Sequence, residues 1–376
     1  MSESFKNINN ISIKIRQNLE DLSSKAFLTL ETISKYQISN VAEISRRSNI
    51  PVSTLHKFIA QLLKSPVRIG IYVDLHVIGL KPYFLTLYNP DQTAIKAVTD
   101  FLEDYYVLLG TINEKNTTIM KICTPEDKDK DLIELLEKLK SIEKVEDYDF
   151  HATTSHIQPP ISFKNYDEEK KLWKISWESI IDDINAGSFA DLDERLKTIK
   201  QTKQWLDEVD IEILKLLDTN AFMELIEIQR ELSALKFQKI YYHYTQHISK
   251  KNMILSFRIK FIPYEEPINY AVIYATFSGS YDMAKFIEAL TSQLYVYSVS
   301  RVIGEPSLLI ELPIHVTMRE GLDNLLEKLK TQKFIREYKT FYADQITEKS
   351  TPYHLYNPST ETWNWKKQIP EIRLAS

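Results

Sequence analysis

The chain contains one segment twice, and this repeat constrains its fold more than any other feature. Residues 132–173 match residues 322–363 without a gap, at a fixed offset of 190, and the match includes a tryptophan and two tyrosines. The run LLEKLK at Leu135–Lys140 returns at Leu325–Lys330. Solenoid repeats are only about 20–50 residues long, so this period does not indicate a solenoid. The sequence predicts two copies of one module, with either a duplicated function or a single function built around an internal pseudo-two-fold.

The composition is that of an ordinary globular chain. Of 376 residues, 43% are apolar and 26% charged, which fits about two to four folded domains. Cys123 is the only cysteine, so a disulfide framework and a cysteine-based zinc site are both excluded. Glycine-rich phosphate loops are absent, which argues against nucleotide binding through them. No secretory signal or membrane-length apolar run is visible, so a cytoplasmic location without a membrane partner is expected.

Charge is distributed unevenly along the chain. The net charge of −5 excludes a protein that binds nucleic acid over its whole surface. Residues 1–64, however, hold nine Lys and Arg against five Asp and Glu, a local balance of +4. A basic end on an acidic chain indicates that this end is the part that contacts phosphate.

Three short helices are predicted in this basic segment, at 24–36, 41–48 and 54–64. Asn40 and Glu43 form a capping-box pattern at the second helix, and Asn49-Ile50-Pro51 ends it. Two short helices joined by a tight turn place the second of them in a major groove. The residues expected to contact DNA in the first copy are Arg46, Arg47, Ser53, Thr54, His56, Lys57, Gln61, Lys64 and Arg68.

The run EISRRSNIPVSTLHKFIAQL resembles the helix-turn-helix of prokaryotic transcription regulators, most closely the isocitrate-lyase-regulator type of winged helix. Asn49 stands where many such turns carry glycine, and asparagine tolerates the left-handed backbone. Residues 67–157 then read β-α-β-β-α-β, the order of a ferredoxin-like sandwich. With the run YVDLHVIGLKPYFLTL, this order resembles the leucine-responsive/AsnC regulators. The resemblance implies a winged helix followed by a small domain that mediates oligomerisation and binds small effectors.

The second copy shows the same resemblance from its first residues, LDEVDIEILKLLDTNA at Leu206–Ala221. Its expected DNA-contacting residues are Lys236, Gln238, Lys239, Tyr242, His243 and Gln246. Residues 206–251 hold six basic and eight acidic side chains, a balance of −2. Two interpretations stay open: this copy reads a different DNA sequence, or its helix-turn-helix is degenerate and serves as a protein-interaction scaffold.

The predicted fold class is α+β, with two winged helix-turn-helix domains and two ferredoxin-like domains in tandem. The expected order is a winged helix-turn-helix at 1–66, a ferredoxin-like domain at 67–157, an aromatic tail with a helical linker at 158–204, a helix-turn-helix at 205–251, a ferredoxin-like domain at 252–345 and a second aromatic tail at 346–376. The tail aromatics repeat at the same offset of 190, so the tails belong to the module. We expect them to pack against the sheets rather than to form an aromatic cage.

Few residues suggest other chemistry. In the AsnC-type relatives, a loop between the second and third strands lies near the ligand, and its counterparts here offer Asn113, Glu114, Gly304 and Glu305; a plain hairpin turn explains these loops equally well. His243 and His247 have the spacing of zinc ligands on a helix, but no third ligand is evident. We therefore expect no metal and no cofactor, and neither a nucleophilic triad nor a carboxylate pair is indicated.

The sequence thus favours a DNA-binding transcription regulator that acts as an intrachain pseudo-dimer and not as an enzyme. Its expected partners are double-stranded DNA and a small-molecule effector, and a homodimer of the whole chain stays open. The alternative is an enzyme of tetrapyrrole biosynthesis, because the siroheme decarboxylases share this two-domain architecture. Their sheet domains carry a histidine in the strand after the first helix, and the equivalent runs here, EDYYVLLG and SQLYVYSVSR, contain none.

Overall fold

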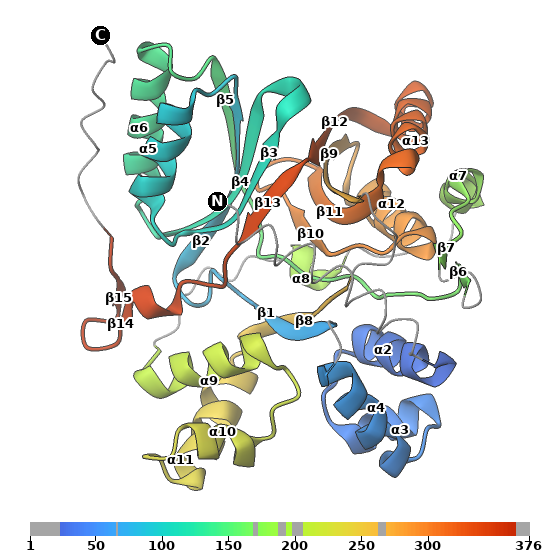
Figure 1. Cartoon of the computed structure of the whole chain (residues 1–376), viewed down its shortest axis with the longest axis vertical. Helices are drawn as coiled ribbons and strands as arrows, with labels where there is room; N and C mark the ends of the chain where they lie inside the picture. The colour runs from blue at the N-terminus through green and yellow to red at the C-terminus, as the bar shows by residue number, and fades with distance from the viewer. Residues whose placement is uncertain are drawn as a thin grey trace.

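The computed structural model describes residues 23–64, 67–167, 172–186, 193–197, 206–261 and 268–365. It is an α+β structure in which two small helical domains lie at one end and two ferredoxin-like domains at the other (Figure 1). The fold class predicted from the sequence is therefore confirmed. Within the described part of the chain, no helix has the length and apolar character needed to cross a membrane.

The first helical domain consists of α2 (Ser24–Tyr36), α3 (Val41–Ser48) and α4 (Val52–Lys64). The Asn40 side chain caps α3 by accepting the backbone N–H of Glu43, as the sequence predicts. Asn49 ends α3 in the left-handed region, at φ 56°, a conformation that asparagine tolerates. The helix that follows begins at Val52, two residues before its predicted start.

The second helical domain has the same order but a different last helix. It consists of α9 (Glu208–Thr219), α10 (Leu225–Glu231), α11 (Phe237–Tyr242) and a π-helical turn, η2 (His243–Ser249), that continues α11. Asp207 caps α9 by accepting the backbone N–H groups of Val209 and Asp210. A π-helical turn is rare and inserts a residue into the helical repeat, so the end of this helix departs from that of α4.

Each ferredoxin-like domain places two helices on one face of a four-stranded antiparallel sheet. The first contains β2 (Leu80–Tyr88), α5 (Gln92–Leu102), β3 (Tyr106–Ile112), β4 (Thr117–Pro125), α6 (Asp129–Ser141) and β5 (Asp147–Ala152). The second contains β9 (Ile268–Phe277), α12 (Ser280–Gln293), β10 (Ser298–Arg301), β11 (Ser307–His315), α13 (Arg319–Thr331) and β12 (Ile335–Ala343). Both sheets have the same strand order, β5-β2-β4-β3 and β12-β9-β11-β10.

The two copies are intertwined through their strands. After each helical domain comes one strand, β1 (Arg68–Val73) or β8 (Ile254–Lys260), and these two strands pair with each other in an antiparallel ladder. Each strand follows its own helical domain directly, and its ladder partner belongs to the other copy. Gly70 permits a close approach here: a Cβ at this position would lie 2.2 Å from the carbonyl oxygen of Asp218 at the end of α9.

Each copy also covers the open sheet edge of the other. Strand β13 (Gln345–Glu348), which follows the second domain, pairs with the edge strand β3 of the first. Reciprocally, the segment after β5 crosses to β10 of the second sheet, where Ile157 and Val299 exchange backbone hydrogen bonds. An uncovered edge strand is a site for unwanted pairing, so the reciprocal exchange protects both sheets.

The aromatic tails form small hairpins that pack as core. The hairpins are β6 (Tyr166–Asp167) with β7 (Leu172–Trp173), and β14 (Tyr356–Asn357) with β15 (Thr362–Trp363). Trp173 and Trp363 are both buried, and the Trp363 indole donates a hydrogen bond to the Ile78 carbonyl at 2.8 Å. The aromatics therefore pack as core, as expected, but partly against helices rather than sheets: Phe163 and Tyr166 contact Phe27 of α2, and Trp365 contacts Phe101 of α5. Between the copies, α7 (Trp177–Ala186) packs against α12 and α13, and α8 (Glu194–Lys197) follows it.

Candidate functional site

The two sheets turn their helix-free faces toward each other, and a buried ion pair joins them. In Figure 1, α5 and α6 lie outside the first sheet and α12 and α13 outside the second. Between the sheets, Lys121 of β4 contacts Glu311 of β11, with Nζ 2.7 Å from Oε1. The two residues are only 7% and 3% exposed. Burying such charges is costly unless they are paired and hydrogen-bonded, so this pair specifies how the two sheets meet.

Lys121 and Glu311 occupy equivalent positions in the two copies. Each is the fifth residue of its strand, and their numbers differ by 190, the offset of the repeat. In a symmetric dimer of one copy, Lys121 would face a second Lys121, or Glu311 a second Glu311. Two like charges buried side by side repel each other, so a fused and diverged chain permits a contact that an identical pair does not.

A second ion pair at the same offset lies further along this junction. Lys339 Nζ of β12 lies 2.6 Å from Asp149 Oδ2 of β5, and Tyr88 shares the contact. Lys339 is half-exposed, so this pair contributes little to stability, about 0–1 kcal/mol. It repeats the pattern of opposite charges at equivalent positions, which indicates that the two copies have diverged to recognise each other.

Next to the buried pair lies a cavity of about 260 Å³, which we call the junction cavity. It lies where the β1–β8 ladder meets the first sheet and β13, so both copies contribute to it. Five of its lining side chains are cationic and one is a carboxylate. Its lining residues are Arg68, Ile71, Tyr72, Val73, Leu75, Val107, Leu108, Lys121, His156, Arg258, Lys260, Glu348, Lys349, Ser350 and Thr351.

Four of the five cations are held in place by carboxylates, one of which, Glu348, itself lines the cavity. Arg258 Nη2 lies 2.8 Å from Asp218 Oδ1, and Lys260 Nζ lies 2.7 Å from Glu348 Oε1. Burial alone would raise the pKa of Glu348, but Lys260 outweighs it and holds that pKa below its ordinary value. Arg68 is exposed at the edge of the cavity. The arrangement fixes four cations, each already paired with a carboxylate, around a small space, and Arg68 adds an exposed guanidinium at its edge for an anionic group.

His156 supplies the one imidazole of the cavity. It is 9% exposed, and its Nδ1 has no hydrogen-bond partner among the described residues, lying 3.8 Å from Glu311 Oε1. Burial, with the nearby Lys121 ammonium, lowers the pKa of His156 from 6.5 to about 3. His156 is therefore neutral at pH 7. A buried polar atom without a partner is uncommon in a folded protein, and this one lies in the wall of the cavity.

This buried histidine predicts a loss of stability on mild acidification. The unfolded chain takes up a proton at His156 near pH 6.5, whereas the folded chain does so only near pH 3. Its contribution is fully present above pH 6.5 and declines as the pH falls toward 3. Urea unfolding should show that wild type loses about 2 kcal/mol more between pH 7 and pH 5 than His156→Gln does. Equal losses in the two proteins would contradict a buried neutral His156.

Below pH 4.5, protonation of a second group, Glu311, should lower the stability further. Burial alone would raise the pKa of Glu311, but Lys121, His156 and a hydrogen bond from Ser298 outweigh it and lower the pKa from 4.5 to about 2. Stability from this carboxylate is present above pH 4.5 and is lost between 4.5 and 2. The two windows overlap only below pH 4.5, so a comparison at pH 5 isolates the histidine.

The structure places most of the predicted DNA-contacting residues on exposed surfaces. In the first helical domain, Arg46 and Arg47 are exposed but both pair with Glu43, and the face of α4 presents Ser53, His56, Lys57, Gln61 and Lys64, with Thr54 half-buried. Arg68 belongs instead to the junction cavity. In the second domain, Lys236, Gln238, Lys239, Tyr242 and Gln246 are exposed.

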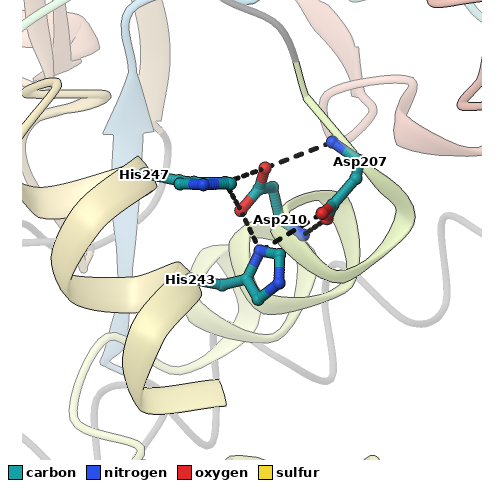
Figure 2. A group of neighbouring side chains, drawn as sticks. All are labelled: Asp207, Asp210, His243 and His247. Atoms are coloured by element: carbon teal, nitrogen blue, oxygen red, sulfur yellow. Dashed lines mark hydrogen bonds and ion pairs between the residues drawn. The ribbon is translucent and has the colours of Figure 1, made fainter. Parts of the chain in front are cut away.

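His243 was expected on this DNA-facing surface, and that placement is wrong. It is 5% exposed and points into the domain, where its Nδ1 lies 3.0 Å from Asp210 Oδ1 (Figure 2). The sequence showed the spacing of His243 and His247 but no further ligand. The structure brings Asp207 and Asp210 to these histidines, from a helix more than 30 residues earlier. Four candidate ligands therefore meet where the sequence alone indicated two.

The candidate effector residues lie in the two loops between the second and third strands. Glu114 is exposed, with Oε1 3.7 Å from Arg319 Nη1, and Glu305 accepts a hydrogen bond from Tyr274. Gly304 has φ 86°, as a tight turn requires. Neither these residues nor Asn113 line the junction cavity. Their role in ligand binding stays a prediction, with the plain hairpin turn as its alternative.

Comparison with known proteins shows distant likenesses only. No family model and no curated protein matches the chain. A solved structure of the siroheme decarboxylase NirDL aligns at 12% identity with a TM-score of 0.47, over 87% of this chain and 93% of that one. The same enzyme in complex with an iron-uroporphyrin III analogue aligns at 11% identity with a TM-score of 0.43, over 93% and 95%. AsnC of E. coli aligns at 18% identity with a TM-score of 0.29, over 40% of this chain and 99% of its own.

These likenesses require one correction. The expectation that this chain is not an enzyme does not stand, because two solved structures that align over 87% and 93% of it are of a siroheme decarboxylase. The AsnC-type likeness predicted from the sequence is found over part of the chain. Matches this distant decide nothing about chemistry, which depends on the side chains.

Proposed function

We propose that this chain binds a carboxylate-rich tetrapyrrole of the siroheme class at the junction cavity and removes carboxyl groups from it. The observation that carries the proposal is the convergence of five cationic side chains, from both copies, around a buried imidazole whose Nδ1 has no partner among the described residues. Fixed guanidinium and ammonium groups are the usual partners of carboxylates in proteins. The solved neighbour named as a siroheme decarboxylase is a reason to test this ligand first.

The size of the cavity limits what enters it. Pockets that enclose a whole small molecule span about 300–1,000 Å³, and the junction cavity measures about 260 Å³. It therefore suits the acetate and propionate side chains of a tetrapyrrole rather than the whole ring. Arg68 and Ser350 are exposed at its edge, where the remainder of such a ligand would lie.

Decarboxylation needs groups of the kind that line this cavity. The bond between the carboxyl carbon and its neighbour breaks, CO₂ leaves, and the electron pair left behind takes up a proton. Cations hold the carboxylate before the bond breaks, and a proton donor must reach the carbon. The Tyr72 hydroxyl carries a proton at neutral pH and donates it in a hydrogen bond to the Tyr297 carbonyl at 3.4 Å. Burial raises the pKa of Tyr72, so this proton is given up only to a strong base such as the carbanion left by decarboxylation. We assign the donor role to Tyr72, with Arg258 and Lys260 holding the carboxylate.

The histidine that the known decarboxylases carry after the first sheet helix is missing from this sequence, and that absence favoured a regulator over an enzyme. His156 comes from a different segment, between β5 and the first aromatic tail, yet it supplies an imidazole to the junction between the sheets. An absent motif residue therefore does not mean an absent functional group. This supports the proposal without requiring the pattern of the known decarboxylases.

The direct test uses siroheme and the purified full-length protein under anaerobic conditions. A saturable change in the visible spectrum is expected on addition, followed by loss of mass corresponding to CO₂ in the recovered pigment. His156→Phe and Tyr72→Phe should separate binding from turnover, because Tyr72→Phe removes only a hydroxyl. No spectral change with siroheme would refute the proposal, and binding without loss of mass would reduce it to tetrapyrrole binding.

DNA binding is the second candidate, favoured by one observation. Both helical domains project from the same end of the molecule, and their last helices present exposed polar faces (Figure 1). Selection of bound duplexes from a random pool, followed by salt titration, tests it. Lys57→Ala with Arg47→Ala should reduce the log–log salt slope by about 1 for each phosphate that the variant no longer neutralises. A slope that does not change would remove the first domain from this role.

A further inference from the structure

We infer that Asp207, Asp210, His243 and His247 form a binding site for a divalent metal ion of the zinc type inside the second helical domain. One candidate ligand atom from each residue lies within 4.8 Å of all the others. Figure 2 shows the four side chains turned toward a common point between α9 and the π-helical turn η2. This site is independent of the proposed tetrapyrrole chemistry and lies in a different domain.

The distances between the four groups lie close to those around a tetrahedral zinc ion, and two of them are at present hydrogen-bond lengths. Zinc binds imidazole nitrogen and carboxylate oxygen at about 2.0–2.2 Å, which separates neighbouring ligands by about 3.3–3.5 Å. His243 Nδ1 lies 3.0 Å from Asp210 Oδ1 and 3.3 Å from Asp207 Oδ2. His247 Nδ1 lies 2.9 Å from Asp210 Oδ2. Small adjustments would place all four around one ion.

The first copy shows that the fold does not require these polar groups. Counted from the first residue of each helix, Asp210 of α9 corresponds to Ala26 of α2, and His243 corresponds to Phe58 of α4. Ala26 is fully buried and Phe58 packs against the apolar core. The second copy has thus replaced an apolar interior with a carboxylate and an imidazole. Such groups are costly inside a small domain, and metal coordination compensates that cost.

The backbone adapts at the same place. At the end of the π-helical turn, the N–H group of its C-cap, Lys250, bonds to the Thr245 carbonyl five residues earlier. The turn continues α11 from His243, and the His243 and His247 rings lie 4.7 Å apart, both against Asp210. Single π turns inside helices occur most often where a functional group must be positioned. Four residues of the right chemistry, a costly interior and a π turn therefore coincide.

The four ligands connect the start of one helix to the end of another. Asp207 and Asp210 lie at the first turn of α9, which packs on β1. His243 and His247 lie in η2, which continues the exposed helix α11. Imidazole and carboxylate together suit zinc and its first-row neighbours rather than calcium or magnesium. A bound ion would hold the exposed helix of the second domain against the helix that anchors this domain to the sheets.

Zinc titration of the full chain, stripped with a chelator, is the test. Competition with a chromophoric chelator should give one tight site per chain, and zinc should raise the unfolding temperature. Asp210→Asn keeps the size of the side chain and its capacity to hydrogen-bond, and should weaken zinc binding on the order of ten-fold or more. His354→Gln is the matched control: its Nε2 lies 2.9 Å from a single carboxylate, Asp104, and zinc affinity should not change.

Three results would overturn the site: no tight zinc binding by wild type, equal affinity in wild type and Asp210→Asn, or equal loss in His354→Gln. His243→Phe with Asp210→Ala restores the residue types of the first copy and keeps the test decisive if Asp210→Asn folds poorly. This double variant should remain folded by circular dichroism while binding no zinc. Zinc binding retained in the folded double variant would also contradict the site.

Discussion

Replacing Lys121 by glutamate should prevent the two halves of the chain from packing against each other. The change removes the ammonium group that neutralises Glu311 and places a second carboxylate against it, with both side chains buried. Breaking a buried ion pair by removing one partner costs about 3–5 kcal/mol, and the added repulsion increases that cost. This is a large part of the roughly 5–15 kcal/mol that typically stabilises a domain. Urea unfolding of wild type and variant measures the difference.

Exchanging the two charges provides the control for this prediction. Lys121→Glu combined with Glu311→Lys restores opposite charges at the same two equivalent positions, and should recover at least half of the lost stability. Lys339→Glu breaks the half-exposed pair with Asp149 and should cost only about 1 kcal/mol. If the exchanged double variant is no more stable than Lys121→Glu alone, the opposite charges of this pair do not determine how the two copies pack together.

Removing Arg68 should weaken tetrapyrrole binding without unfolding the protein. This side chain is exposed at the edge of the junction cavity and forms no ion pair with any described residue. The fold therefore does not depend on its charge. A hydrogen bond between charged groups contributes about 1.5–3 kcal/mol, so Arg68→Ala should raise the dissociation constant about ten- to a hundred-fold. Absorbance titration with iron uroporphyrin III measures it.

A matched variant distinguishes binding in this cavity from non-specific attraction of the ligand by positive surface charge. Lys64 is exposed and basic but does not line the cavity, so Lys64→Ala should leave the affinity within about two-fold of wild type. A similar loss in both variants would mean that the ligand is attracted only by the overall basic surface. Unchanged affinity in Arg68→Ala would place the ligand elsewhere.

The repeated elements could be predicted from sequence because their signals are local. LLEKLK forms the core of α6 and α13, and Leu132, Leu135, Leu136 and Leu139 are all buried as helical spacing predicts. The left-handed end of α3 at Asn49 could also be predicted, because it depends on one residue type. The order of helices and strands along each sheet domain, β-α-β-β-α-β, could be predicted in the same way.

The exchange between the copies could not be predicted from local pattern. Strand β13, with the sequence QITE, has only one apolar residue, so no local pattern predicts that it is a strand or that it joins the sheet of the other copy. The pairing of β1 with β8 is of the same kind, because each strand's partner lies in the other copy. Partners of this kind depend on contacts between residues far apart in the chain.

Some of the missed site residues had a readable signal. Lys121 and Glu311 are opposite charges at the repeat offset, each inside an apolar strand, and comparing charges between the copies would have found them. His243 shows the limit of such reading: counting helix positions suggested an exposed side chain, whereas packing against Asp210 buries it. Asp207 and Asp210 looked like an ordinary helix start, and only the fold brings them to the histidines.

The central claim is that the chain is an asymmetric pseudo-dimer whose halves fit each other and not themselves. Native mass spectrometry of residues 1–204 and 205–376, expressed separately and together, tests it most directly. The structure predicts a one-to-one complex of the two different halves when they are co-expressed, because Lys121 then faces Glu311 and each tail completes the other sheet. Stable homodimers of either half, persisting in the presence of the other, would contradict it.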